Sequence, residues 1–218
     1  MKERPILFSA PMVRAILSGS KSQTRRIVRW PTWAQPHPEV FARDLRDGQE
    51  VWYVPGGGQP SKVMRCPYGQ PRDRLWVREG FRLVRTVPGG VDGDTLPPSK
   101  FLDSTRRYEA DREESYPDAR MRVFGKRRSP IHMPRWASRI TLEVTGVRVE
   151  RLQDISHIDA VAEGCSTGSW TIAEGPRPEA PFGSNAVKRY RLLWESINGP
   201  GSWDVNPWTW VVEFRRLP

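Results

Sequence analysis

Segments with a strand pattern are seldom separated by a single helix in this chain, and this order limits the folds that it can adopt. Apolar and polar residues alternate over Asp73–Glu79, and again from Ile140 through Gly146 to Val149. A third strand-like run covers Trp208–Phe214. Alternation is typical of strands with one buried face, and Gly146 indicates a bulge or a tight turn. The order disfavours a parallel α/β sheet and predicts an α+β fold, a small and mostly antiparallel β-barrel with flanking helices.

Helix signals lie on either side of these strand-like segments. Residues 10–17 follow a short strand expected at Pro5–Ser9, carry an apolar stripe and end before Gly19, which can adopt a positive φ. Ile155–Gly164 predicts a helix of about two turns. Asn185–Asn198 is amphipathic and predicts the longest helix.

Stretches rich in Pro, Gly or charged residues interrupt this pattern. We interpret the chain as a single domain, residues 1–218, with insertions at about 30–60, 82–130 and 166–183. Within residues 30–72 we expect at most one short strand, at Val51–Val54, and within residues 82–135 one strand near Tyr108.

Composition limits the partners and the class of site. The net charge of +10 favours a polyanionic partner, either nucleic acid or a phosphorylated small molecule. Of the 35 basic residues 29 are Arg, which is no evidence for phosphate recognition by itself but favours bidentate contacts wherever a site exists. Two cysteines make no disulfide framework, and three scattered histidines lack metal-ligand spacing, so we expect neither metal nor cofactor. No apolar run approaches the length of a membrane span, and the N-terminal residues lack a signal sequence. We therefore expect a cytoplasmic protein that does not bind membranes.

The segment Gly19–Arg26, with the sequence GSKSQTRR, places an amine, a hydroxyl group and two guanidinium groups close together. It lacks the glycines of a phosphate-binding loop. A buried Lys21 could remove the proton of the Thr24 hydroxyl, which is otherwise a poor nucleophile. Glu163, at the end of the helix that Ser156 and Asp159 cap, could serve as the acid or base of such a reaction. Alternatively, Lys and Arg here only complement the end of the preceding helix.

Several motifs in this order resemble an ASCH domain, of the type encoded in phages and prophages. The motifs that carry the resemblance are Gly19-x-Lys21-x-x-Thr24-x-Arg26, Asp73–Glu79, Ile131–Trp136, the strand from Ile140, Leu152–Gly164, Ile197–Trp203 and Trp208–Phe214. The resemblance implies a PUA-like β-barrel. Relatives often have Gly where this chain has Arg72, so we expect a different turn there.

The resemblance also implies an activity. Many ASCH domains have Glu at the position of Thr24 and are thought to bind RNA, whereas the bacterial subgroup with Thr hydrolyses the amide of N4-acetylcytidine. Carried over to this chain, Thr24 would be the nucleophile, Lys21 its base and Glu163 the acid/base partner. The expected substrate is an N4-acylated cytidine nucleoside or nucleotide, in a bacterial or phage-infected host cell. A binding module for RNA or modified DNA is the first alternative, and a ribonuclease is the second, although no suitable pair of histidines supports it.

Further residues are candidates for contact with the substrate or a nucleic acid. These are Arg25, Arg26, Tyr68, Arg78, Glu79, His132 and Arg135. His132 and Trp136 lie within a basic segment from Lys126 to Arg139. Phosphates could contact its Arg side chains while a base stacks on Trp136. The alternative is a solvated loop with one buried Trp.

Overall fold

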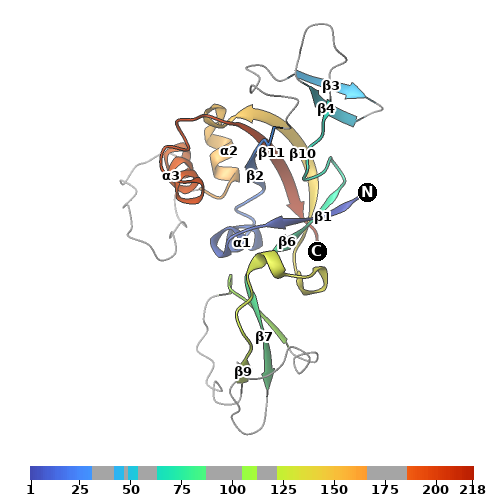
Figure 1. Cartoon of the computed structure of the whole chain (residues 1–218), viewed down its shortest axis with the longest axis vertical. Helices are drawn as coiled ribbons and strands as arrows, with labels where there is room; N and C mark the ends of the chain where they lie inside the picture. The colour runs from blue at the N-terminus through green and yellow to red at the C-terminus, as the bar shows by residue number, and fades with distance from the viewer. Residues whose placement is uncertain (31–41, 47–48, 54–62, 87–104, 112–121, 166–185) are drawn as a thin grey trace.

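The computed structural model describes residues 1–30, 42–46, 49–53, 63–86, 105–111, 122–165 and 186–218. These residues form an elongated molecule with a central body and a small sheet near each end of its long axis (Figure 1). No helix in these ranges is both long enough and apolar enough to cross a bilayer.

A five-stranded sheet forms the central body. Its strand order is β1 (Glu3–Leu7), β6 (Arg74–Arg78), β10 (Thr141–Arg151), β11 (Trp208–Arg216) and β2 (Gln23–Ile27). β1 and β6 are parallel, and the other neighbours are antiparallel. The predicted α+β class and mostly antiparallel sheet are therefore confirmed.

The predicted bulge lies in β10. The register of β10 against β11 shifts between Val144 and Gly146. A Cβ atom at Gly146 would lie 2.6 Å from Glu213 Oε2, so a larger residue there would displace the end of the Glu213 side chain. The two longest strands stay paired on both sides of the irregularity.

The edge strand β2 was not predicted from the sequence. The polar cluster begins in the connection after α1, and its later residues belong to Gln23–Ile27, which pairs antiparallel with β11 over its whole length. The hydrogen bonds and buried neighbours that β11 offers outweigh the weak strand pattern of this polar segment. β2 and β1 are the two outer strands, and the Arg26 guanidinium donates a hydrogen bond across them to the Leu7 carbonyl.

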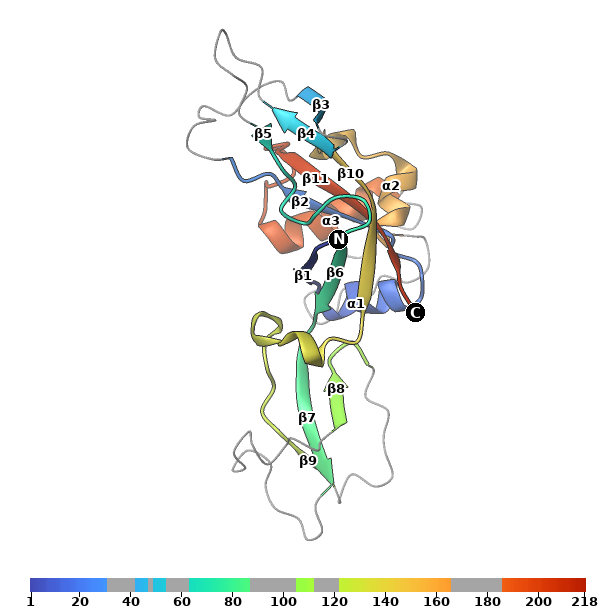
Figure 2. The same ribbon diagram turned by 90° about the vertical axis from the view of Figure 1, so that its right-hand side faces the viewer.

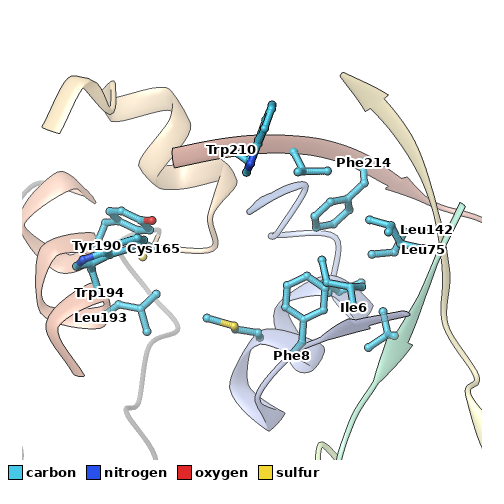
Figure 3. Packing of buried hydrophobic residues seen from close by; sticks show 14 of the residues in the cluster. Ile6, Phe8, Leu75, Leu142, Cys165, Tyr190, Leu193, Trp194, Trp210 and Phe214 are labelled. Carbon is cyan, nitrogen blue, oxygen red and sulfur yellow. The ribbon is translucent and has the colours of Figure 1, made fainter. Parts of the chain in front are cut away.

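Three helices of the described chain lie near their predicted positions. They are α1 (Ala10–Leu17), α2 (His157–Ala162) and α3 (Ala186–Asn198). The capping box between Ser156 and Asp159 is present at the start of α2. The helices cover one side of the central sheet, and side chains from α1, α3 and the strands form the main hydrophobic core (Figures 1 and 3).

The insertions contain more strands than we predicted. In the first, β3 (Ala42–Arg46), β4 (Gln49–Tyr53) and β5 (Val63–Met64) form an antiparallel sheet where one strand was expected. In the second, β7 (Phe81–Thr86) lies between β8 (Thr105–Tyr108) and β9 (Arg122–Phe124). These strands are only two to six residues long, too short to carry the alternation that identifies a strand from sequence. The third insertion lies outside the described residues, and the division into one domain stays a prediction.

In the turn before β6, one residue that is not glycine has a backbone conformation that glycine adopts more readily. Arg72 has a φ of 75°. Because a Cβ atom makes this region unfavourable, we expect Arg72→Gly to stabilise the fold by about 0.5–1 kcal/mol. Urea unfolding of the two proteins measures the difference. Arg74→Gly, in the extended backbone of β6, is the control and should destabilise the fold, whereas a less stable Arg72→Gly protein would contradict the prediction.

Candidate functional site

The connection between α1 and β2 holds Lys21 in place from two sides. Gly19, with a φ of 77°, ends the helix, and the Lys21 amide donates to the Ala15 carbonyl over 3.0 Å. The Ser22 amide donates to the Ala162 carbonyl over 2.9 Å, which joins this connection to the C-terminal end of α2. Glu163 is the next residue after that carbonyl. Backbone hydrogen bonds therefore bring these two distant segments together.

Lys21 and Glu163 form a buried ion pair. Lys21 Nζ lies 2.6 Å from Glu163 Oε2 and 3.0 Å from the Glu163 carbonyl oxygen, and the two side chains are 0% and 3% exposed. Burial lowers the pKa of Lys21 below its usual value, although the Glu163 carboxylate opposes this shift. A lowered pKa increases the fraction of the amine that is neutral near neutral pH, and only the neutral amine can accept a proton.

Thr24 is buried on β2, opposite Val212 of β11. Alternate residues of a strand share a face, so Thr24 and Arg26 lie on one side of β2 and Arg25 on the other. Arg26 Cζ lies 5.4 Å from the centroid of the Phe8 ring, and Lys21 Nζ lies 5.8 Å from the same centroid. The amine therefore lies beside the ring that borders the Thr24 face.

Arg25 occupies the opposite face and contacts three carboxylates. Its Nη2 lies 2.9 Å from Glu150 Oε2 and 3.2 Å from Asp159 Oδ2, and its Nη1 lies 3.7 Å from Glu163 Oε1. The side chain is 0% exposed. We predicted a contact to substrate or phosphate, but the guanidinium is engaged by protein carboxylates. Its position indicates that Arg25 orients Glu163.

Other groups of this network were missed in the sequence. Arg148 forms ion pairs with Glu150, Asp159 and Glu213. Arg148 and Glu150 are two residues apart on β10, which was the available signal that they share a face. Asp159 was identified only as a capping residue. Burial alone would raise the pKa of Asp159, but hydrogen bonding to Ser156 and the nearby arginines hold it below its usual value.

Aromatic and thiol groups from α3 and the end of α2 border the network. The Tyr190 ring centroid lies 6.0 Å from Arg25 Cζ, and burial raises the pKa of Tyr190 well above its usual value. Figure 3 shows Tyr190 next to Trp194 and Cys165. Burial raises the pKa of the Cys165 thiol and of the Cys66 thiol to about 12, as expected of unreactive buried cysteines.

Among the remaining predicted residues, Arg78 and Tyr68 lie at the boundary of the central body. Tyr68 is half-buried against the main core. Arg78 Cζ lies 4.7 Å from the centroid of the Trp76 ring. The Arg78 carbonyl accepts a hydrogen bond of 3.1 Å from the Phe8 amide, so this end of β6 adjoins the ring that borders the candidate site.

Glu79, another predicted contact residue, is buried in an ion pair with Arg139. Nε of Arg139 lies 3.0 Å from its Oε1, and Glu79 is 1% exposed. Burial raises the pKa of Glu79, opposed by Arg139. These contacts join β6 to the segment before β10, so we assign Glu79 a structural role in place of substrate contact.

His132 and Arg135 lie on two exposed 3-10 turns, η5 (Pro130–His132) and η6 (Arg135–Ala137). Arg135 forms two hydrogen bonds of 2.9 Å to Glu3. Trp136 is 63% exposed, so the alternative in which this loop buries its Trp is wrong. Within the described ranges, no group of three or more His, Cys, Asp or Glu residues could hold a metal ion.

Comparisons with known proteins identify no relative. No protein-family model matches the chain, and neither the curated proteins nor the solved structures give a significant match. The ASCH resemblance therefore stays a prediction. The main structural observation at the candidate site is the contact of Lys21 with Glu163, close in the chain to the buried Thr24.

Proposed function

We propose that this protein is an amidohydrolase that removes the acyl group from N4-acylated cytidine. The observation that carries the proposal is the buried contact of 2.6 Å between Lys21 Nζ and Glu163 Oε2. Thr24 follows Lys21 by three residues and is likewise buried. A base with a lowered pKa, a hydroxyl and a carboxylate are the groups that hydrolysis of an amide through a covalent intermediate requires.

In the proposed reaction, Lys21 Nζ takes the proton from the Thr24 hydroxyl as Oγ1 attacks the acyl carbon. The bond between that carbon and N4 then breaks, and N4 takes a proton from the Lys21–Glu163 pair, which leaves cytidine and a Thr24 ester. Water, deprotonated by the same pair, attacks the ester carbon. The bond between that carbon and Thr24 Oγ1 breaks, and Oγ1 takes the proton back from the pair. The products are the carboxylic acid and the free Thr24 hydroxyl. No cofactor takes part in these steps.

We also propose that the central sheet is the PUA-like barrel of an ASCH domain. The hydrogen bond from Arg26 to the Leu7 carbonyl supports this, because it joins the two outer strands of the sheet. Closing a sheet on itself brings its outer strands together. The order of the motifs along the chain is the second support.

A binding module for RNA or modified DNA is the second candidate function. The exposed Trp136 and the exposed arginines beside it favour this candidate. No contact among the described residues favours a ribonuclease over either candidate.

The test of the proposal is acid release from N4-acylated cytidines, supplied as nucleosides, nucleotides and oligonucleotides. We expect the rate to rise with pH until the lowered pKa of Lys21 is passed, because only the neutral amine accepts a proton. Lys21→Arg is the matched variant, since a guanidinium keeps the charge but does not lose its proton. It should release no acid at any pH. Acid release by Lys21→Arg at the wild-type rate, or none by the wild type on any substrate, would reject the proposal.

A further inference from the structure

An exposed basic surface with an aromatic residue adjoins the candidate site. We call it the turn surface and define it by residues from β6, from η5 and η6 and from the segment before them: Arg78, Lys126, Arg127, Arg128, His132, Arg135 and Trp136. The two turns lie at the junction between the central sheet and the sheet of β7, β8 and β9 (Figure 2).

The two turns pack against buried side chains, which fix the position of Trp136. The neighbouring Met133 and Ala137 are buried with Phe81 and Tyr108 in the second hydrophobic cluster. The Tyr108 hydroxyl donates to the Ala137 carbonyl over 2.9 Å. A tryptophan that is 63% exposed on such a support offers apolar area that the fold itself leaves in contact with water.

Positive charge dominates the turn surface. Arg78 Cζ and Arg135 Cζ lie 4.7 Å and 6.0 Å from the centroid of the Trp76 ring. Arg127 pairs with Glu109, yet its side chain stays 70% exposed. The carboxylates paired with these arginines, Glu3 and Glu109, are fewer than the basic residues of the surface. The surface therefore complements a polyanion.

Phe8 contacts both Arg78 and the candidate site, through its backbone and its buried ring respectively. The Phe8 amide bonds to the Arg78 carbonyl, and the Phe8 ring borders Lys21 and Arg26. In β6, Arg74, Trp76 and Arg78 share the outer face because Leu75 and Val77 are buried in the core. The basic side chains therefore lie on the outer face of β6, at the end where Arg78 contacts Phe8.

We propose that the turn surface binds single-stranded nucleic acid, with a base stacked on Trp136 and phosphates on Arg127, Arg135 and Arg78. Stacking on an aromatic side chain next to basic residues is the usual basis of such binding. The proposal has a second part, which rests on the proposed function. Binding of a strand at the turn surface makes an acylated cytidine within an oligonucleotide the preferred substrate of the candidate site.

The first test measures binding of short oligocytidylate and oligodeoxycytidylate, unmodified and labelled, by fluorescence anisotropy. We expect Trp136→Ala to weaken binding by about tenfold and Trp136→Phe, which keeps a stacking ring, to restore most of it. Arg127→Gln should reduce the slope of log Kd against the logarithm of the salt concentration by about 0.7. Arg191→Gln is the matched control, because Arg191 is also an exposed arginine in ion pairs but lies on α3. Preference for one sugar identifies RNA or DNA as the ligand.

Equal affinity of the wild type and Trp136→Ala for both oligonucleotides would overturn the proposal. Trp136 is exposed, so its replacement leaves the core intact and the result is not confused with unfolding. Binding to unmodified strands needs no turnover. If binding depends on Trp136 but no acid is released, the proposal for the turn surface stands and the amidohydrolase proposal is rejected. With acid release, Trp136→Ala should raise KM for the acylated oligonucleotide and leave KM for the nucleoside unchanged.

Discussion

Replacement of Thr24 by alanine should reduce acid release from N4-acetylcytidine by at least about a thousandfold, because no other group in the proposed reaction supplies the attacking oxygen. The side chain is buried but small, and its strand is paired along its length with β11. The variant should therefore fold and retain the Lys21–Glu163 pair. Acid release, followed by titration or by chromatography of the cytidine product, measures the loss.

Two further substitutions separate loss of the hydroxyl from loss of packing at Thr24. Thr24→Val keeps the volume and the branched shape, so it should be as inactive as Thr24→Ala. Thr24→Ser keeps a hydroxyl and should retain measurable turnover, and denaturation during turnover should trap an acyl ester on the introduced serine. Equal rates for the wild type and Thr24→Val would show that Thr24 is not the nucleophile.

Replacement of Glu163 by alanine should lower the free energy of unfolding by about 3–5 kcal/mol, because it leaves a buried charge without its partner. Lys21 is 0% exposed and its carboxylate partner lies 2.6 Å away. Arg25 would lose one of its carboxylate neighbours but keep Glu150 and Asp159. Urea unfolding followed by circular dichroism measures the difference.

The double variant Lys21→Met/Glu163→Leu provides the control for this loss of stability. It removes both charges and fills their volume with apolar groups, so it should be more stable than Glu163→Ala alone. It should also be inactive. A Glu163→Ala protein within about 1 kcal/mol of the wild type would contradict the burial of this pair, since exposed pairs contribute no more than that.

Elements with a clear local sequence signal could be predicted from the sequence. The capping box at Ser156 identified α2, Gly146 identified the bulge of β10, and strict alternation identified β6. β2 has no such signal, because Gln23–Ile27 is mostly polar and is a strand only through its pairing with β11. In the two small sheets, the strands expected at Val51–Val54 and near Tyr108 correspond to β4 and β8. The other strands were missed because they are only two to six residues long and carry little alternation.

The candidate site was predictable only in part. The motif identified Lys21 and Thr24. The side chains that surround them could not be predicted, because they depend on which segments pack against one another in the fold. Arg25 follows Thr24 directly, so the pattern could not show that it points to the other face and engages Glu150 and Asp159. The exposure of Trp136 was equally hidden, because an aromatic residue in a polar segment is compatible with burial or exposure.

The pairing of β2 with β11 has a consequence for synthesis of the protein. β2 follows Lys21 closely, yet its partner strand β11 is made about 180 residues later. At the usual speed of translation, this separation corresponds to roughly ten to forty seconds. During that time Lys21 has no finished sheet beside it and Thr24 has no opposite strand. The nascent chain therefore acquires the complete site only when β11 leaves the ribosome and enters the sheet.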